Sequence, residues 1–259
     1  MLTYLSHFIE AWGPLRLFES LTFRMTMAGG TSLLIGMLIA PRLFARLRQL
    51  KASQSFRDKS EVGKLADLHA SKKNTPTMGG LMIYIAVTIS ALLWAAPSTY
   101  VFTALLVYTG LTVIGFCDDF LKVSKRNSKG LPSRYKLAGQ AAVTALAVAL
   151  LLSDSGISGQ MREWWVPFYK SALIGSMPIG VMFLFFFLVI GGSSNAINLT
   201  DGVDGLAIGC TVSVALAYGI MSYAAGNAVI SDYLLLSFLP GTGELAVVCS
   251  ALVGARLAF

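Results

Sequence analysis

The sequence predicts an all-α, polytopic transmembrane protein with about seven spans, because its residues are strongly apolar and its charges are scarce. Hydrophobic residues make up 55% of the 259 residues, and the 13% charged residues are about half of the roughly 25% typical of soluble domains. The mean hydropathy is +0.69. Disordered, collagen-like and coiled-coil chains have different compositions. We expect one integral-membrane domain over residues 1–259.

Seven apolar runs approach the ~20 residues that cross a bilayer as a helix. They should all be helical, because an isolated strand leaves backbone groups without partners in lipid. The seventh run is short and reaches the end of the sequence. The expected spans are approximately Phe23–Phe44, Met78–Ala95, Tyr100–Cys117, Leu137–Leu152, Ser171–Ile190, Gly205–Ala225 and Glu244–Phe259.

Basic residues concentrate in two of the connections between these spans. Fifteen of the 20 Lys and Arg residues lie between the first and second spans or between the third and fourth, when Arg42 at the end of the first span is included. The positive-inside rule therefore places these connections in the cytoplasm and the N-terminus outside. Topology and anionic headgroups account for the net charge of +7, so we expect membrane lipid and no nucleic acid as a partner.

Four aspartates at the expected cytoplasmic face are not explained by topology. Asp118 and Asp119 follow the apolar run Leu111–Cys117, and Asp201 and Asp204 stand at the entry to the sixth span. A carboxylate at this depth is unfavourable without a partner. An interfacial cap or a lysine counter-ion would explain one such residue, but two clusters beside cationic loops favour a functional site.

The second aspartate cluster contains a regular polar pattern. If residues 198–205 are helical, Asn198, Asp201, Gly202 and Gly205 share one face. Glycines on that face would let a bulky ligand approach the backbone, although glycine is also common where membrane helices pack. The Asn and Asp side chains have no such packing explanation, so we interpret this face as part of a site.

A further polar segment precedes the second span. Thr75 followed by Pro76 fits a helix N-cap and first helical position, which would direct free amides and the positive helix dipole toward the cytoplasm. Lys72, Lys73, Thr75 and Thr77 beside this end would form an anion site. Cations, a helix N-terminus and hard oxygen ligands on one face suit phosphate and Mg²⁺.

These features favour a reaction between two phosphorylated substrates. Two anions approach each other only when a metal ion and lysines neutralise their charge. The membrane location implies that one substrate is a lipid phosphate.

Three motifs, in order, resemble the phospho-N-acetylmuramoyl-pentapeptide transferase family of the polyprenyl-phosphate N-acetylhexosamine-1-phosphate transferase superfamily. They are Lys72–Gly80, Gly115–Lys122 and Asn195–Leu206. The resemblance implies transfer of phospho-MurNAc-pentapeptide from UDP-MurNAc-pentapeptide to undecaprenyl phosphate, giving lipid I and UMP with Mg²⁺ as cofactor. It also implies a bacterial inner-membrane protein with a cytoplasmic active face and a homodimeric state.

The resemblance assigns roles to residues of these motifs. Asp118, Asp119 and Asp201 would be catalytic, with Asp118 as the base that deprotonates the lipid phosphate. Asp118 and Asn198 would ligate Mg²⁺, whose main ligand is expected beyond Phe259. The transfer reaction could proceed by direct displacement or through a covalent aspartyl intermediate, and the sequence leaves both mechanisms open. The expected substrate-binding residues are Lys72, Thr75, Thr77, Lys122, Asn195, Asn198, Gly202 and Asp204.

The sequence departs from this family at its C-terminal side. Family members have about ten spans of ~20 residues each, with a Met-Gly-Asp-x-Gly-Ser segment and a His-rich loop beyond the seventh. Here the sequence ends at Phe259, and Arg256 stands where the family has a small residue. A cation in a span is unfavourable unless it is paired or snorkels to the interface. We expect a truncated, frame-disrupted or fragmentary product.

Three other interpretations remain open. A polyprenyl-phosphate GlcNAc-1-phosphate transferase would share the superfamily, although the Thr-Pro-Thr-Met-Gly-Gly form at residues 75–80 favours the muramoyl-pentapeptide branch. A transporter or channel would use the aspartates to bind cations, but such sites usually lie near the bilayer midplane. A non-catalytic remnant is the third.

Because the motif expected to hold the main metal ligand is absent from the sequence, we predict that residues 1–259 alone do not catalyse the transfer. The measurement is lipid I formation by the detergent-purified chain with UDP-MurNAc-pentapeptide and undecaprenyl phosphate. Lipid I above the level of a no-enzyme control would contradict the prediction.

Overall fold

A computed structural model describes residues 2–4, 13–49, 78–125, 130–166, 171–200 and 205–259. Within these ranges the chain is helical, and its only β-pairing is an isolated bridge between Trp164 and Ile174. The predicted all-α fold is therefore confirmed. Three short helices are η2 (Gly13–Glu19), α7 (Ser155–Met161) and α10 (Ala228–Tyr233). The longer helices are α1 (Leu21–Gln49), α4 (Gly80–Trp94), α5 (Thr99–Lys125), α6 (Ser133–Ser153), α8 (Ile179–Thr200), α9 (Leu206–Ala225) and α11 (Gly243–Leu257).

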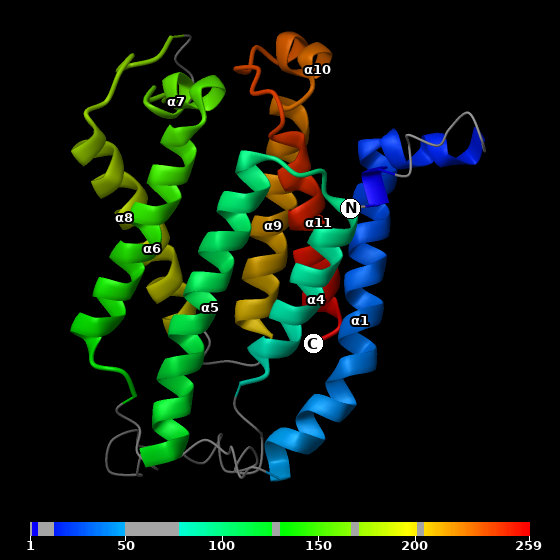
Figure 1. Cartoon of the computed structure of the whole chain (residues 1–259), viewed down its shortest axis with the longest axis vertical. Helices are drawn as coiled ribbons and strands as arrows, with labels where there is room; N and C mark the ends of the chain where they lie inside the picture. Colours follow the sequence, from blue (N-terminus) through cyan, green and yellow to red (C-terminus); the bar gives the residue numbers. More distant parts are fainter. Residues whose placement is uncertain (1, 5–12, 50–77, 126–129, 167–170, 201–204) are drawn as a thin grey trace.

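The long helices form an antiparallel bundle (Figure 1). In that view α1, α5, α8 and α11 run downward, and α4, α6 and α9 run upward. Five helices, α1, α5, α6, α8 and α9, are long and apolar enough to cross a membrane. The chain is thus a multi-pass membrane protein. Each of the seven expected spans contains a helix, but α4 and α11 have only 15 residues each.

The 15-residue helices α4 and α11 pack against each other and against α1. With 15 residues, α4 is about 22 Å long, less than the ~30 Å hydrocarbon core. α11 packs against α1, α9 and α4. Its residues Ala246, Val247, Ala251 and Ala255 are 0% exposed, so protein surrounds it where lipid would surround an outer helix. In Figure 1, α11 ends well above the lower ends of α1 and α5.

The predicted boundaries of the fifth span are wrong. We expected Ser171–Ile190, whereas α8 runs from Ile179 to Thr200. Apolar residues 173–174 belong instead to a segment whose backbone pairs with Trp164 through hydrogen bonds of 2.8 and 2.9 Å. Proline lacks a backbone N–H and suits a helix start, and the Pro178 carbonyl accepts the N–H of Met182. The Asn195 motif therefore begins inside α8 and not in a loop.

Two other local expectations also need correction. The condition that residues 198–205 are helical fails at Gly205, which has a left-handed φ of 80°, whereas residues 198–200 belong to α8 and residues 201–204 lie outside the described residues. The φ of 72° at Met78 likewise prevents a helix from running continuously from Pro76 into α4. Thr75 itself lies outside the described residues.

At the lower end of the bundle in Figure 1, α1 and α5 end and α6 begins. These helix ends carry several cations. We call this the basic end, defined by Arg42, Arg46, Lys122, Lys125, Arg134 and Lys136. The opposite end carries Arg16, Arg24 and Arg162 among the described residues. The two expected basic connections thus lead to the same end of the bundle.

Small residues let α1 and α11 approach closely. A Cβ atom on Gly254 would overlap the carbonyl oxygen of Gly29. One helical turn before Gly254, the Ser250 hydroxyl donates to the Met25 carbonyl at 2.6 Å. Close backbone contact of this kind is typical of membrane helices, which lack a strong hydrophobic drive to associate.

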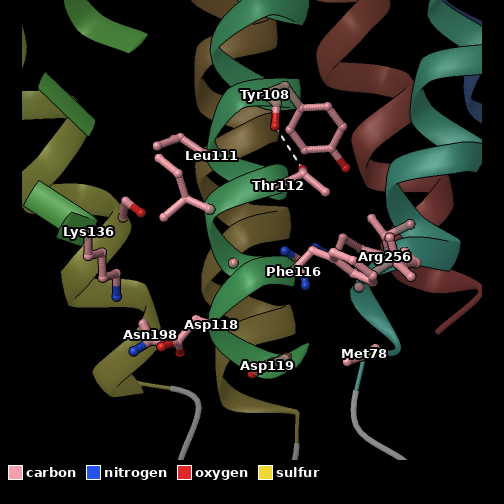
Figure 2. Close-up of a pocket in the computed structure, with 16 residues that line it drawn as sticks. Met78, Tyr108, Leu111, Thr112, Phe116, Asp118, Asp119, Lys136, Asn198 and Arg256 are labelled. Atoms are coloured by element: carbon pink, nitrogen blue, oxygen red, sulfur yellow. Dashed lines mark hydrogen bonds between the residues drawn. The ribbon is translucent and has the colours of Figure 1, made fainter. Parts of the chain in front are cut away.

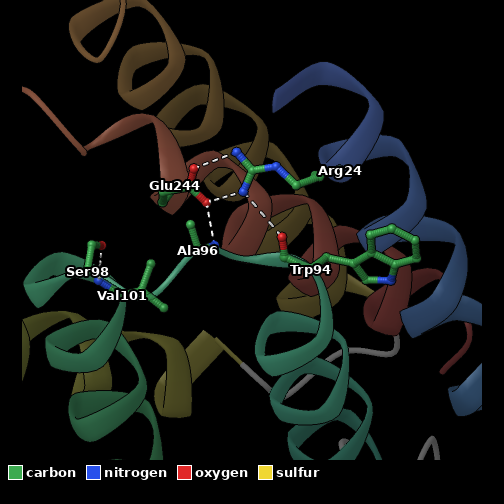
Figure 3. Close-up of polar contacts among 6 residues, drawn as sticks. All are labelled: Arg24, Trp94, Ala96, Ser98, Val101 and Glu244. Atoms are coloured by element: carbon green, nitrogen blue, oxygen red, sulfur yellow. Dashed lines mark hydrogen bonds and ion pairs between the residues drawn. The ribbon is translucent and has the colours of Figure 1, made fainter. Parts of the chain in front are cut away.

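A buried ion pair joins the upper ends of the same helices (Figure 3). The two terminal nitrogens of Arg24 donate to the Glu244 carboxylate at 2.6 and 2.7 Å. Their side chains are only 7% and 14% exposed. Arg24 also donates to the Trp94 carbonyl at 3.3 Å, and Glu244 accepts the Ala96 N–H at 2.7 Å. One pair thus connects α1, α11 and the turn between α4 and α5.

We predict that Arg24→Met destabilises the fold by about 3 kcal/mol, because it leaves Glu244 buried without its counter-charge. The measurement is chemical unfolding in detergent micelles. Arg42→Met, on the exposed side of the same helix, should change stability by less than about 0.5 kcal/mol. Equal effects of the two variants would contradict the prediction. The double variant Arg24→Met, Glu244→Leu should recover part of the loss, because no unpaired charge remains.

Candidate active site

Five helices, α4, α5, α6, α8 and α11, line a cavity of about 270 Å³ toward the basic end (Figure 2). Lys136 of α6 and Asn198 of α8 lie on one side of it, and Arg256 of α11 lies on the other. α5 contributes Asp118 and Asp119 near the lower rim and Tyr108 at the upper part. The cavity therefore brings two carboxylates and two cations together from helices distant in the sequence.

Asp118 is held from two directions. Its Oδ2 lies 2.6 Å from Lys122 Nζ, and its Oδ1 accepts the Leu131 N–H at 2.7 Å. Lys122 also lies 3.2 Å from Asp119 Oδ1. These ion pairs follow from the helix, since residues three and four apart share a face. The Asp118 side chain is 16% exposed and that of Asp119 is 39% exposed, so Asp119 is the more accessible carboxylate.

The contact with Leu131 requires a glycine at the preceding position. Gly130 has φ = 56°, a left-handed conformation that favours glycine. A Cβ there would overlap Asp118 Oδ1 and lie 2.8 Å from Lys122 Cε. Gly130 therefore lets the segment before α6 return against the end of α5 and orient the carboxylate of Asp118.

Two asparagines of α8 have different surroundings: Asn195 packs against α6, and Asn198 lines the cavity. Asn195 donates to Gln140 Oε1 at 3.1 Å and to the Gly191 carbonyl at 2.8 Å. Gln140 is fully buried in α6 and donates to Ser194 Oγ at 3.3 Å. The Asn195 amide thus holds α8 against α6 and does not line the cavity, whereas Asn198 does.

The structure brings together some of the residues that the sequence proposed for the site. Asp118, Asp119 and Asn198 line the cavity, and Lys122 lies beside them through its two ion pairs. Asn195 is adjacent but is used in packing. The remaining site predictions lie outside the described residues; these are Lys72, Thr75, Thr77, Asp201, Gly202 and Asp204.

Sequence reasoning missed several residues that line the cavity. Lys136 was interpreted only as a topological charge, and Arg256 only as an anomaly in a span. Tyr108 and Thr112 gave no sequence signal beyond being polar and four residues apart in an apolar helix. Only the structure shows that both residues line the cavity, where the Thr112 hydroxyl donates to the Tyr108 carbonyl at 2.7 Å.

The cavity offers oxygen ligands that fit a magnesium ion. Among the described residues, no group of three or more His, Cys, Asp or Glu side chains is arranged to hold a metal. Asp118, Asp119 and Asn198 nevertheless present hard oxygens to one cavity. Mg²⁺ is usually bound through one or two carboxylates, with water and substrate phosphates completing the coordination. This incomplete protein ligand set is therefore chemically suitable.

The sequence matches known proteins across the residues that form this cavity. Residues 101–259 match glycosyl transferase family 4, and residues 72–83 match signature 1 of phospho-N-acetylmuramoyl-pentapeptide-transferase. The chain is 49% identical over 259 residues to the phospho-N-acetylmuramoyl-pentapeptide-transferase of Opitutus terrae, covering 100% of this chain and 70% of that protein. The chain belongs to this family.

A second relative agrees. The phospho-N-acetylmuramoyl-pentapeptide-transferase of Methylacidiphilum infernorum is 44% identical over 261 residues, covering 100% of this chain and 71% of that protein. Four cavity residues of α4 or the turn before it, including Met78 and Gly80, fall inside the phospho-N-acetylmuramoyl-pentapeptide-transferase signature. The sequence-based assignment to this family is thereby confirmed.

We predict that Gly130→Ala loosens the contact between Leu131 and Asp118, because the new methyl group meets the carboxylate and the backbone is strained. Amide hydrogen exchange at Leu131 should accelerate by about tenfold, which corresponds to roughly 1.4 kcal/mol. Gly209→Ala is the matched control, because that glycine is helical and has open space around its Cα. Unchanged exchange at Leu131 in Gly130→Ala would contradict the assignment.

Proposed function

We propose that the function of this protein is the transfer of phospho-MurNAc-pentapeptide from UDP-MurNAc-pentapeptide to undecaprenyl phosphate, giving lipid I and UMP, and that residues 1–259 contribute the substrate-binding cavity described above. The observation that carries the proposal is the cavity at the basic end, which is lined by Asp118, Asp119 and Asn198 together with the cations Lys136 and Arg256. Such a set suits two phosphorylated substrates, since cations offset their charge and a carboxylate accepts a proton. The names of the two relatives support this choice of substrates.

The location of the cavity suits substrates from two phases. It lies between membrane-crossing helices but near their charged ends, so a lipid phosphate can enter from the bilayer and a nucleotide sugar from water. We propose that the protein lies in the bacterial inner membrane, with its N-terminus outside and its basic end in the cytoplasm. The cation distribution supports this orientation through the positive-inside rule. A homodimer remains part of the proposal.

Asp118 is the proposed general base. It takes the proton of the lipid phosphate, whose oxygen then bonds to the sugar-bearing phosphorus of the donor. The bond from that phosphorus to the bridging oxygen breaks, and UMP leaves with the electron pair. Lys122 and the Leu131 N–H hold Asp118 in position for this transfer. A two-step route through an aspartyl phosphate would use the same pair of carboxylates.

Asp118, Asp119 and Asn198 are the described residues that would hold Mg²⁺. When bound, Mg²⁺ would neutralise phosphate oxygens and so lower the repulsion between the two substrates. The remaining neutralisation falls to Lys136 and Arg256, which line the same cavity.

The decisive test is substrate binding by the 259-residue chain in lipid nanodiscs, because binding does not require a complete catalytic set. We expect the chain to bind UDP-MurNAc-pentapeptide in the presence of Mg²⁺ and to bind UDP-GlcNAc at least about tenfold more weakly. Lys136→Met should weaken nucleotide binding by about tenfold if this cation meets a phosphate. Lys125→Met is the matched control, because Lys125 is exposed at the same end and does not line the cavity.

Three outcomes would contradict the proposal. Preference for UDP-GlcNAc would favour a GlcNAc-1-phosphate transferase. Failure to bind either nucleotide sugar would refute a transferase using these donors. Cation flux through the reconstituted chain, altered by Asp118→Asn without any effect on nucleotide binding, would indicate a transporter or channel.

A further inference from the structure

The cations around the cavity have different surroundings. Lys122 forms ion pairs with both Asp118 and Asp119, so its charge is neutralised by carboxylates at the end of α5. Lys136 and Arg256 line the cavity itself. Lys136 stands near the start of α6, whereas Arg256 lies in the last turn of α11, which ends inside the bundle. Arg256 is thus a cation placed at depth among apolar helices.

The backbone that carries Arg256 is firmly held. Gly254 and Ala255 are buried, and a Cβ on Gly254 would overlap the Gly29 carbonyl oxygen. After Arg256, Ala258 packs closely against Gly36 of α1. A Cβ atom added to Gly36 would lie 2.6 Å from the Cβ of Ala258. These contacts fix one side of the α11 end against α1. The Arg256 side chain extends from α11 toward α5 and into the cavity (Figure 2).

The cavity wall near Arg256 is suited to an anion. The upper part of this wall carries Tyr108 and Thr112, and Arg256 lies close enough to Tyr108 for the two side chains to interact electrostatically. A guanidinium has five N–H donors in a planar fork that matches phosphate oxygens. A guanidinium can therefore bind a phosphate while it also contacts protein groups. The carboxylates lie further down α5, toward the lower rim.

We propose that Arg256 forms an anion subsite on the membrane-side wall of the cavity, separate from the Asp118–Asp119 pair, and that it binds a phosphate group of a substrate. The ligand chemistry is a phosphate or diphosphate group, carried by either the lipid or the nucleotide. The identity of the carrier rests on the proposed function, whereas the anion subsite itself does not. A bound phosphate would also stabilise a cation at this depth, where a charged side chain is otherwise unfavourable.

The first experiment uses inorganic pyrophosphate as the probe, titrated into the nanodisc-embedded chain by calorimetry. We expect Arg256→Ala to weaken binding by about tenfold or more, as charge-assisted hydrogen bonds typically contribute. The pyrophosphate affinity of Arg256→Lys should lie between those of wild type and Arg256→Ala, because lysine keeps the positive charge but lacks the planar set of N–H donors. Arg42→Ala is the matched control, since Arg42 is an exposed arginine at the same end that does not line the cavity.

Melting curves of all variants show whether each one is folded, and Arg256→Lys keeps the test informative if Arg256→Ala does not fold. Equal affinity of wild type and both Arg256 variants would overturn the proposal, as would failure of wild type to bind pyrophosphate. A loss in Arg42→Ala as large as in Arg256→Ala would also overturn it, because the effect would then be general surface charge.

The second experiment identifies the source of the phosphate. Binding of UDP-MurNAc-pentapeptide and of undecaprenyl phosphate is measured for wild type and Arg256→Ala. If Arg256→Ala loses affinity for undecaprenyl phosphate alone, the subsite binds the acceptor. If it loses affinity for UDP-MurNAc-pentapeptide alone, the subsite binds the donor. If wild type binds both substrates and Arg256→Ala binds both equally well, the substrate role is overturned. Arg256-dependent pyrophosphate binding without binding of either substrate would instead refute the proposed function and leave the anion subsite standing.

Discussion

The close contact between α1 and α11 is the constraint on which the other parts of the structure depend. The two helices meet backbone to backbone at Gly29 and Gly254, and the buried Arg24–Glu244 pair joins their upper ends. These contacts hold α11 inside the bundle, where Ala246, Val247 and Ala251 are 0% exposed. This packing in turn places Arg256 at the cavity.

The candidate site is built from helix ends and from one returning segment. α5 continues beyond the apolar run to Lys125, which gives Asp118 and Asp119 a helical register with Lys122. The left-handed turn at Gly130 then brings an amide back to Asp118. Across the cavity, the Gln140–Asn195 pair holds α6 and α8 together, which leaves Asn198 facing the cavity. Structural polar contacts thus orient the residues proposed to meet substrate.

The basic residues have separate roles that a count of charges does not distinguish. Arg42 lies on the exposed surface, consistent with a contribution to topology alone. Lys122 is paired with two carboxylates, while Lys136 and Arg256 line the cavity. A phosphate-transfer site needs both kinds of charge, because carboxylates that accept protons and bind metal also repel anionic substrates. In this cavity Lys136 of α6 and Arg256 of α11 offset the negative charge of the carboxylates and the substrates.

The sequence by itself determined the helical class, the alternation of helices and the family, because apolar runs, charge distribution and contiguous motifs are local properties of a chain. It also identified Asp118, Asp119 and Asn198, which lie within those motifs. Only the tertiary structure decided that Asn195 packs against Gln140, that α8 begins at Ile179, and that Lys136 and Arg256 share a cavity. The reason is physical: which face of a helix turns inward, and how deeply a short helix sits, depend on contacts with distant segments.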